Sequence, residues 1–227
     1  MEARDAILAR IHDALGRSGD ASSRTSMTPG APTGSTPARA YRTHTGVEPG
    51  SPQALDLFVE RVEDYRARVH RCTEAELPAV LAGLLDDDGG VVVPPGLPTA
   101  WTDAVTGARV DDPPLSHAAL DEVGAVLTAA RVGIAETGTI VLDAQSDQGR
   151  RVISLIPDHH VCVVRAEQVV VTVPEAVAVL GEHPDRPQTW IAGPSATSDI
   201  ELERIEGVHG PRVLDVVVVA ASSSRRH

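Results

Sequence analysis

The sequence predicts an α/β protein in which a mainly parallel β-sheet is flanked by helices. Apolar runs such as Val91-Val92-Val93 are continuous rather than alternating, which is typical of strands buried on both faces of a sheet. Segments with helical periodicity alternate with these runs. The chain has 227 residues, of which 42% are hydrophobic, enough for the core of one ordinary domain with an appendage, or at most two small domains.

The first 50 residues are predicted to be an appendage. A short amphipathic helix is predicted over residues 2–16, because four apolar side chains lie on one stripe: Ile7, Leu8, Ile11 and Leu15. The following stretch is poor in large apolar residues, so we expect a flexible linker. The predicted organisation is an N-terminal helix (1–17), a linker (18–50) and an α/β domain (51–227).

The predicted elements of the domain begin at Ser51-Pro52, a pair typical of a helix N-terminus. One face of this long helix is expected to carry Leu55, Phe58, Val59, Val62 and Val69. Two further helices are predicted at 74–85 and 174–180. Strands are predicted at 91–93, 123–127, 139–142, 161–164, 189–192 and 214–219.

Charge and aromatic content argue against nucleic-acid binding. The chain has 20 basic and 32 acidic residues, a formal net charge of −12, so bulk charge disfavours binding to phosphate backbones or anionic membranes. Aromatic residues make up 2% of the chain, which leaves few rings for stacking on bases. The sequence contains no lysine, which excludes a Schiff-base or P-loop lysine.

No cofactor or metal is expected on this chain. Cys72 and Cys162 are far apart and form no C-x-x-C motif, so they cannot build a zinc ribbon or an iron–sulfur cluster alone. The G-x-G-x-x-G and H-E-x-x-H motifs are absent. The charged start and the short apolar run at 216–221 predict neither a signal peptide nor a membrane helix, and we expect a cytoplasmic location.

The first polar segment that could carry chemistry spans residues 133–142. Gly138 can aim consecutive backbone N–H groups into one concavity, and the hydroxyls of Thr137 and Thr139 could complete an anion-binding nest. Glu136 beside that nest is a candidate general base or nucleophile. The alternative is a tight turn between strands with a solvated Glu136.

A second segment, Pro157-Asp158-His159-His160, precedes a predicted strand. Because neighbouring residues on a strand point to opposite faces, His159 and His160 cannot both serve one small site. One of them can exchange a proton near neutral pH, and the alternative is structural hydrogen bonding.

The third segment runs from the predicted strand at 189–192 to residue 212. Arg212 could bind a carboxylate or phosphate, and glycines on both sides of His209 would let backbone approach a ligand. A hydrolase triad of Ser195, His209 and Asp199 is disfavoured because the G-x-S-x-G elbow is missing. Asp199 and Glu201 could hold Mg²⁺, although a solvated acidic edge is favoured.

Four motifs in this order resemble those of the lactate utilization protein C family, which carries the LUD domain. They are AETGTIVL at 135–142, Pro157 followed by His160, GPS at 193–195 with DIE at 199–201, and GVHGP at 207–211. The resemblance covers about residues 51–227. It implies a fold similar to the NagB/RpiA/CoA-transferase group.

The resemblance also implies a role in the bacterial oxidation of L-lactate to pyruvate, together with two partner proteins, one or both of which carry the iron–sulfur centres. A strand-end pocket would bind a small anionic ligand, with Glu136 and His209 as catalytic candidates. The ligand-binding candidates are Thr137, Gly138, Thr139, His160, Gly193, Ser195, Asp199, Gly210 and Arg212.

Two other classes of function stay open. One is an acyl or CoA transferase, or an enzyme related to the folate cyclo-ligases of this fold group, that uses Glu136. The other is an assembly or regulatory module without a ligand. The sequence leaves open whether the chain catalyses a reaction by itself.

Overall fold

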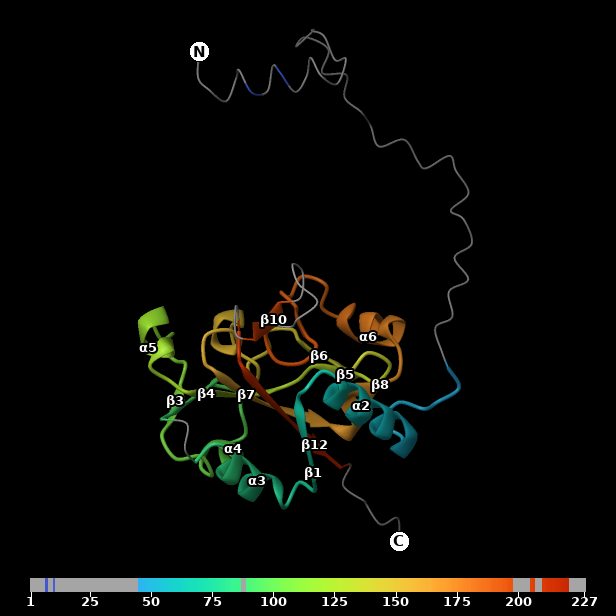
Figure 1. The fold of residues 1–227 in the computed structure, drawn as a ribbon, viewed down its shortest axis with the longest axis horizontal. Helices are drawn as coiled ribbons and strands as arrows, with labels where there is room; N and C mark the ends of the chain where they lie inside the picture. The colour runs from blue at the N-terminus through green and yellow to red at the C-terminus, as the bar shows by residue number, and fades with distance from the viewer. Residues whose placement is uncertain are drawn as a thin grey trace. The chain divides into compact units, whose positions relative to one another are not determined.

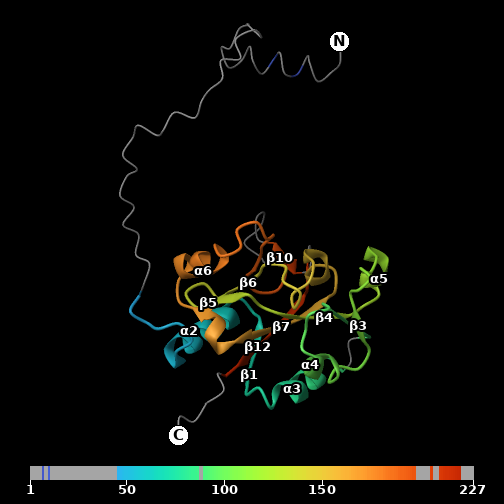
Figure 2. The same cartoon turned by 180° about the vertical axis from the view of Figure 1, so that it is seen from behind.

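The structure, a computed structural model, describes residues 45–86, 89–197, 205–206 and 210–220, together with Ile7 and Arg10. Apart from Ile7 and Arg10, the predicted helix at 2–16 lies outside the described residues, as does most of the predicted linker at 18–50. The chain divides into two units, Met1–Tyr41 and Arg42–His227, and the second holds the predicted α/β domain. Figures 1 and 2 show that domain from two opposite sides.

The main sheet has six strands, and every neighbouring pair in it is parallel. This confirms the predicted fold class. The register places His159 opposite both Ala125 and Val213, so three central strands begin close to one line. In order across the sheet the strands are β1 (Arg68–Cys72), β12 (Val213–Val219), β7 (His159–Arg165), β4 (Ala125–Ala129), β2 (Val91–Val93) and β3 (Ala108–Val110).

A second, smaller sheet was not anticipated. It contains two of the predicted strands, now paired with each other in antiparallel fashion, and β5 also pairs with β8 in parallel. In order the strands are β8 (Val169–Val170), β5 (Val132–Ile134), β6 (Thr139–Leu142) and β9 (Thr189–Ile191). Beyond β9 the chain forms a two-stranded antiparallel pair, β10 (Ala196–Thr197) with β11 (Ile205–Glu206).

Helix α2 (Pro52–Asp64) starts as the sequence predicts, because the Ser51 hydroxyl accepts a hydrogen bond from the amide of Ala54. Helix α6 (Val173–Leu180) begins with a capping box between Thr172 and Glu175. The remaining helices are α3 (Leu77–Leu84), α4 (Thr99–Thr102) and α5 (His117–Asp121), with short 3-10 turns η1 (Arg151–Ser154) and η2 (Ala166–Gln168).

The core has several layers, which explains the continuous apolar strands. One face of the six-stranded sheet packs against α3 and α4, through side chains such as Val161, Val217, Leu81 and Trp101. The other face packs against α2 and the small sheet, through Cys162, Val216, Phe58 and Ile140 among others. Helix α6 covers the small sheet from outside, as Figures 1 and 2 show. Alternate residues of β7 and β12 are therefore buried on opposite faces.

The predicted placement of Val69 on the first helix is wrong. Helix α2 ends at Asp64, Arg66 has a positive φ of 65°, and Val69 lies on edge strand β1. A positive φ cannot continue a right-handed helix, and a β-branched residue fits a pleated strand. Short elements were also missed, because runs of two to five residues carry little periodicity: α4, α5, β3, β5, β8, β10 and β11.

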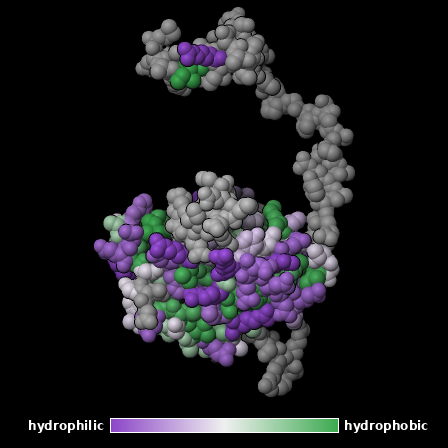
Figure 3. All heavy atoms as spheres, viewed as in Figure 1, coloured by the Kyte–Doolittle hydropathy of each residue, from purple (hydrophilic) through white to green (hydrophobic). Residues whose placement is uncertain are grey.

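Hydrophilic side chains cover most of the face drawn in Figure 3, with hydrophobic ones scattered between them. Within the part of the chain that the structure describes, no helix has the length and apolarity that crossing a membrane requires.

Candidate functional site

A cavity of about 290 Å³ lies beside the first residues of β7 and β12. It contains residues from all but the first of the predicted polar segments, since His160, Gly193, Ser195 and Gly210 all line it. Its other lining residues are Arg151, Ser154, Leu155, Thr189, Trp190, Ile191, Ala192, Pro194, Pro211 and Leu214.

The position of this cavity differs from what open α/β sheets usually show. Ligands in such sheets bind beyond the carboxyl ends of the strands. Here His160 and Leu214 stand opposite each other at the starts of β7 and β12, so the cavity lies at the amino ends. The small sheet creates it, because β9 and the residues after it run across that end of the main sheet.

Backbone contacts join the two segments that form one wall. The amide of Ser195 donates to the carbonyl of Pro211 at 2.8 Å, which brings residues 193–195 beside 210–211. Gly193 has a φ of 80°, and a Cβ there would lie 2.6 Å from the carbonyl oxygen of Tyr65. Only glycine permits this turn against the end of helix α2.

Turn η1 supplies the cationic side of the cavity. Arg150 is held by Asp111 through two hydrogen bonds of 2.6 and 2.8 Å, and it also donates to the carbonyl of Leu115. This anchor fixes the start of η1, whose next residue, Arg151, is exposed and lines the cavity. Arg151 forms no ion pair with any described residue, so its charge is available to an anion.

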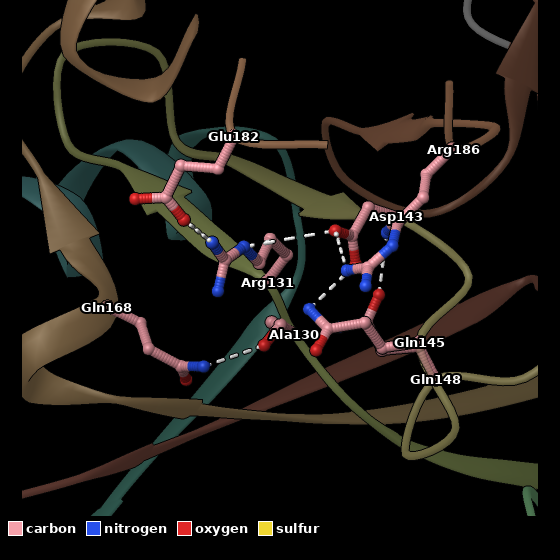
Figure 4. A network of polar contacts seen from close by, with 8 residues as sticks. All are labelled: Ala130, Arg131, Asp143, Gln145, Gln148, Gln168, Glu182 and Arg186. Atoms are coloured by element: carbon pink, nitrogen blue, oxygen red, sulfur yellow. Dashed lines mark hydrogen bonds and ion pairs between the residues drawn. The ribbon is translucent and has the colours of Figure 1, made fainter. Parts of the chain in front are cut away.

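A polar network fixes the loop that leads from β6 to η1 (Figure 4). The buried carboxylate of Asp143 accepts hydrogen bonds from Gln145 at 3.0 Å and from Arg186 at 3.2 Å. The backbone amide of Asp143 donates to the side-chain oxygen of Gln148 at 2.6 Å. Arg131, the residue before β5, lies 3.8 Å from Asp143 and forms an ion pair with Glu182 at 2.5 Å. These contacts join the loop after β6 to the segment after α6.

His160 is a neutral imidazole on the wall of the cavity. Its ring is 1% exposed, and Nε2 lies 2.8 Å from the Thr128 hydroxyl on β4. Burial, reinforced by the charge of neighbouring His159, lowers the pKa of His160 to about 3. Beyond Thr128 lies Cys162, whose pKa burial raises to about 12, so it is an unreactive thiol at neutral pH.

His159 points to the opposite face, as strand alternation predicts, and joins a charged cluster that we did not anticipate. Asp215 on β12 has no exposed surface, and its carboxylate accepts from His159 Nε2 at 2.7 Å, from His70 Nε2 at 2.6 Å and from Arg68. Burial alone would raise the pKa of Asp215, but these hydrogen bonds outweigh it and lower the pKa to about 2.

One sequence signal could have revealed this cluster. Asp215 is the only charged residue within the apolar run of β12, VLDVVVV. A buried carboxylate needs compensating donors, so such a residue predicts cationic partners on the adjacent strands. A hollow of about 550 Å³ lies beside the cluster, with Arg68, His159 and Asp158 among its lining residues.

The segment around Glu136 lies elsewhere. Glu136 is exposed in the turn between β5 and β6 and does not line the cavity of His160. The Thr137 hydroxyl donates to that of Thr139 at 2.8 Å. Gly138 has a φ of 60°, and a Cβ there would lie 2.5 Å from the carbonyl carbon of Arg61, so this glycine permits close packing on α2.

Three other candidates are not part of the described cavity. Asp199 and His209 lie outside the described residues, so their roles stay predictions. Arg212 pairs with Asp158 at 3.4 Å, and both side chains are exposed. Within the described part of the chain, no group of three or more His, Cys, Asp and Glu side chains could hold a metal ion.

The cavity therefore combines an unpaired cation, two serines and a neutral imidazole acceptor or donor. A guanidinium suits a carboxylate, and the imidazole suits a second polar group on the same small molecule. The Ser154 hydroxyl donates to the carbonyl of Arg151 at 2.9 Å and so holds turn η1 in place.

Comparison with known proteins identifies a family domain in this chain. The model of the LUD domain matches residues 116–219. A lactate utilization protein C from Deinococcus radiodurans is 51% identical over 169 residues, which cover 74% of this chain and 80% of that protein. One from Geobacillus kaustophilus is 30% identical over 128 residues, 52% of this chain and 53% of that protein.

A solved structure agrees with these matches. The crystal structure of a DUF162 family protein from Deinococcus radiodurans superposes with a TM-score of 0.64 and 45% identity, and the match covers 74% of this chain and 96% of that one. The order of motifs, the fold and these similarities agree with one another. The chain belongs to the lactate utilization protein C family of LUD-domain proteins.

Proposed function

We propose that this protein takes part in bacterial lactate utilization by binding a small carboxylate in the cavity beside His160. The observation that carries the proposal is the exposed Arg151, which has no ion-pair partner among the described residues and lines the same cavity as Ser195. A guanidinium binds a carboxylate through charge-assisted hydrogen bonds, which are stronger than neutral ones. Relatives of this chain are named for lactate utilization, which supports a role in lactate metabolism.

We further propose that the chain acts with two other lactate-utilization proteins, one or both of which carry the iron–sulfur centres that accept electrons from lactate. The two cysteines of this chain, Cys72 and Cys162, are both buried and lie on opposite faces of the main sheet. This placement supports a division of labour in which redox centres belong to the partners. The cytoplasmic location expected from the sequence stays a prediction.

Growth tests the metabolic role. A strain that lacks this gene and has no paralogue should fail to grow on L-lactate as sole carbon source, and it should grow normally on pyruvate. Complementation with the wild-type gene should restore growth on lactate. Normal growth of the deletion strain on lactate would remove the metabolic assignment.

Ligand titration tests the cavity. Arg151→Ala should weaken binding of L-lactate by about tenfold or more in isothermal titration calorimetry, because a hydrogen-bonded charge pair contributes ~1.5–3 kcal/mol. Arg109→Ala is the matched control, since Arg109 is also exposed but lies on edge strand β3. Equal affinity for both variants would show that lactate does not use this cavity.

The transferase alternative depends on Glu136. This residue is exposed and lies outside the cavity lining, so carboxylate binding is better supported. Incubation of the purified chain with an acyl-CoA and a search for a mass adduct on Glu136 would decide between them. An adduct on wild type that is absent from Glu136→Gln would establish the transferase.

A further inference from the structure

Part of the wall of the His160 cavity is aliphatic, and strand register shows which side chains form it. His160 and Leu214 lie opposite each other on β7 and β12, so both point to the face of the main sheet that packs against the small sheet. On β9, Ile191 lies opposite Ile140 of β6, which belongs to the same core cluster as Leu214. Leu214 and Ile191 therefore point into the space between the two sheets, and both line the cavity.

Trp190, in contrast, belongs to the outer face of the small sheet. It lies opposite Val141, which packs in the core cluster beneath α6, so its indole points away from the main sheet. The cavity therefore offers a ligand aliphatic contacts instead of aromatic stacking. A third aliphatic residue of the lining, Leu155, follows turn η1 and is 38% exposed, which leaves apolar surface for a ligand to cover.

The polar groups of the cavity do not balance this aliphatic wall. The Ser154 hydroxyl donates to the carbonyl of Arg151, and His160 Nε2 contacts the Thr128 hydroxyl, so both side chains already have partners within the protein. Arg151 is the charged residue among the described lining residues, and it has no ion-pair partner in the described part of the chain. One cation beside aliphatic side chains suits a ligand with one anionic end and an apolar body.

The cavity is also larger than a three-carbon acid requires. Its volume of about 290 Å³ corresponds to roughly ten waters, because a water occupies ~30 Å³ in the liquid. L-Lactate has six non-hydrogen atoms, so it leaves part of this space to water that contacts aliphatic side chains. Hydrocarbon in place of that water raises affinity by about fourfold for each methylene that becomes buried.

We propose that the His160 cavity binds aliphatic carboxylates of about six carbons, and that it binds them more tightly than three-carbon acids. Arg151 binds the carboxylate, while Leu214, Ile191 and Leu155 contact the hydrocarbon body. The proposal rests on the proposed function, since it assumes that the cavity binds a carboxylate at all. It adds the ligand class of that site, which is an aliphatic acid larger than lactate.

Two pairs of acids that differ only in chain length test the ligand class on the wild-type full chain: L-lactate with L-2-hydroxyhexanoate, and propionate with hexanoate. The longer acid of each pair has three more methylenes and should bind about tenfold or more tightly in isothermal titration calorimetry. Equal or weaker binding of the longer acids, with L-lactate still bound, would overturn the ligand class and leave the proposed function in place. Binding of none of the four would overturn both.

Three variants locate the longer acid. Arg151→Ala should weaken both hydroxy acids by the same factor, because they share the carboxylate, whereas Ile191→Ala should weaken L-2-hydroxyhexanoate more than L-lactate. Val69→Ala is the matched control: Val69 is also partly buried against the same core cluster on an edge strand, but it does not line the cavity, so both affinities should stay unchanged. An unchanged preference for the longer acid in a folded Ile191→Ala variant would overturn the proposal, and so would a longer acid that is insensitive to Arg151→Ala.

The heat capacity of binding tests the same contact without any variant, so the proposal stays testable if Ile191→Ala does not fold. Burial of apolar surface on binding makes the heat-capacity change negative. Titrations of wild type at several temperatures should therefore give a more negative heat-capacity change for L-2-hydroxyhexanoate than for L-lactate. Equal values would show that the added hydrocarbon stays in water, and they would overturn the proposal.

Discussion

The two faces of the main sheet at the start of β7 hold consecutive histidines in opposite environments. His159 donates to a buried carboxylate, Asp215, that also accepts from His70 and Arg68. His160 has only the neutral partners Thr128 and, through it, Cys162. The difference shows that the neighbours across the sheet, and not the strand itself, set the charge of each imidazole.

The Asp215 cluster has the features of a structural site, whereas the His160 cavity has those of a ligand site. The charges around Asp215 largely neutralise one another and join strands β1, β12 and β7. The cavity of His160 instead keeps Arg151 unpaired among the described residues and leaves Nδ1 of the ring without a partner there. Groups with unsatisfied hydrogen-bonding capacity in a concave site are suited to bind ligands.

The largest effect is expected from Asp215→Ala. Removal of the carboxylate leaves His159, His70 and Arg68 without their shared acceptor, and breaking a buried charge pair typically costs ~3–5 kcal/mol of unfolding free energy. Arg68 is partly exposed, so we expect the lower end, about 3 kcal/mol. Urea denaturation measures it. A loss of less than about 1 kcal/mol would contradict the structural role of the cluster.

The second prediction concerns acid stability and the His160 face. The folded pKa of His160, about 3, lies below that of an unfolded histidine, so the unfolded chain binds the proton first. Stability due to His160 is present above pH ~6.5 and decreases toward pH 3, by at most ~1.4 kcal/mol per pH unit. His160→Gln should flatten the dependence of unfolding free energy on pH, measured in urea between pH 4.5 and 7.

The control for that experiment is His183→Gln, because His183 is exposed. Its pH profile should match that of wild type. The contribution of Asp215 falls in a different window: its folded pKa, about 2, is lowered, so its stabilisation is present above pH ~3.9 and lost as the pH falls toward 2. A wild-type slope in His160→Gln would contradict the neutral state of His160.

A smaller effect is expected for His70→Ala. This variant leaves Asp215 Oδ1 without the donor that now lies 2.6 Å away, and His159 and Arg68 still contact Oδ2. Loss of a hydrogen bond to a buried charged group predicts a destabilisation of ~1–3 kcal/mol in thermal or urea unfolding. His117→Ala, at an exposed position, should change stability little. A similar change in both variants would show that His70 does not stabilise Asp215.

The smallest effect is expected for Arg212→Ala. The pair of Arg212 with Asp158 is exposed on both sides, so its loss should change the unfolding free energy by ~0–1 kcal/mol. Because Arg212 does not line the His160 cavity, lactate affinity in calorimetry should equal that of wild type. A loss of affinity as large as that of Arg151→Ala would restore Arg212 as a ligand-binding residue.

Local patterns predicted much of the fold, since their physical causes are local. The run Val91-Val92-Val93 is a strand because both faces of the main sheet are covered, and Ser51-Pro52 starts a helix by capping it. Val69 was assigned to the wrong element, because its helical spacing from Val62 continues past the end of α2 and the positive φ of Arg66. The antiparallel small sheet was missed, because apolar runs do not indicate which strands pair.

The sequence indicated some residues of the candidate site, and only the structure revealed the others. Motif resemblance brought together His160, Gly193, Ser195 and Gly210, and the cavity contains all four. It did not indicate Arg151, because an arginine in a short turn has no local signature of function. It also did not indicate Arg68 and His70, which meet Asp215 from positions 147 and 145 residues away in the sequence.

The sequence by itself determined that this is an α/β protein of the LUD-domain family, and that His159 and His160 face opposite sides of a strand. These properties follow from burial, strand alternation and motif order, which act along the chain. Only the tertiary structure decided that β12 lies between β1 and β7, and that β9 crosses the amino ends of the main sheet. Strand order places distant side chains within hydrogen-bond distance, and therefore gave one histidine a buried carboxylate as its partner and left the other a neutral imidazole beside a hydroxyl.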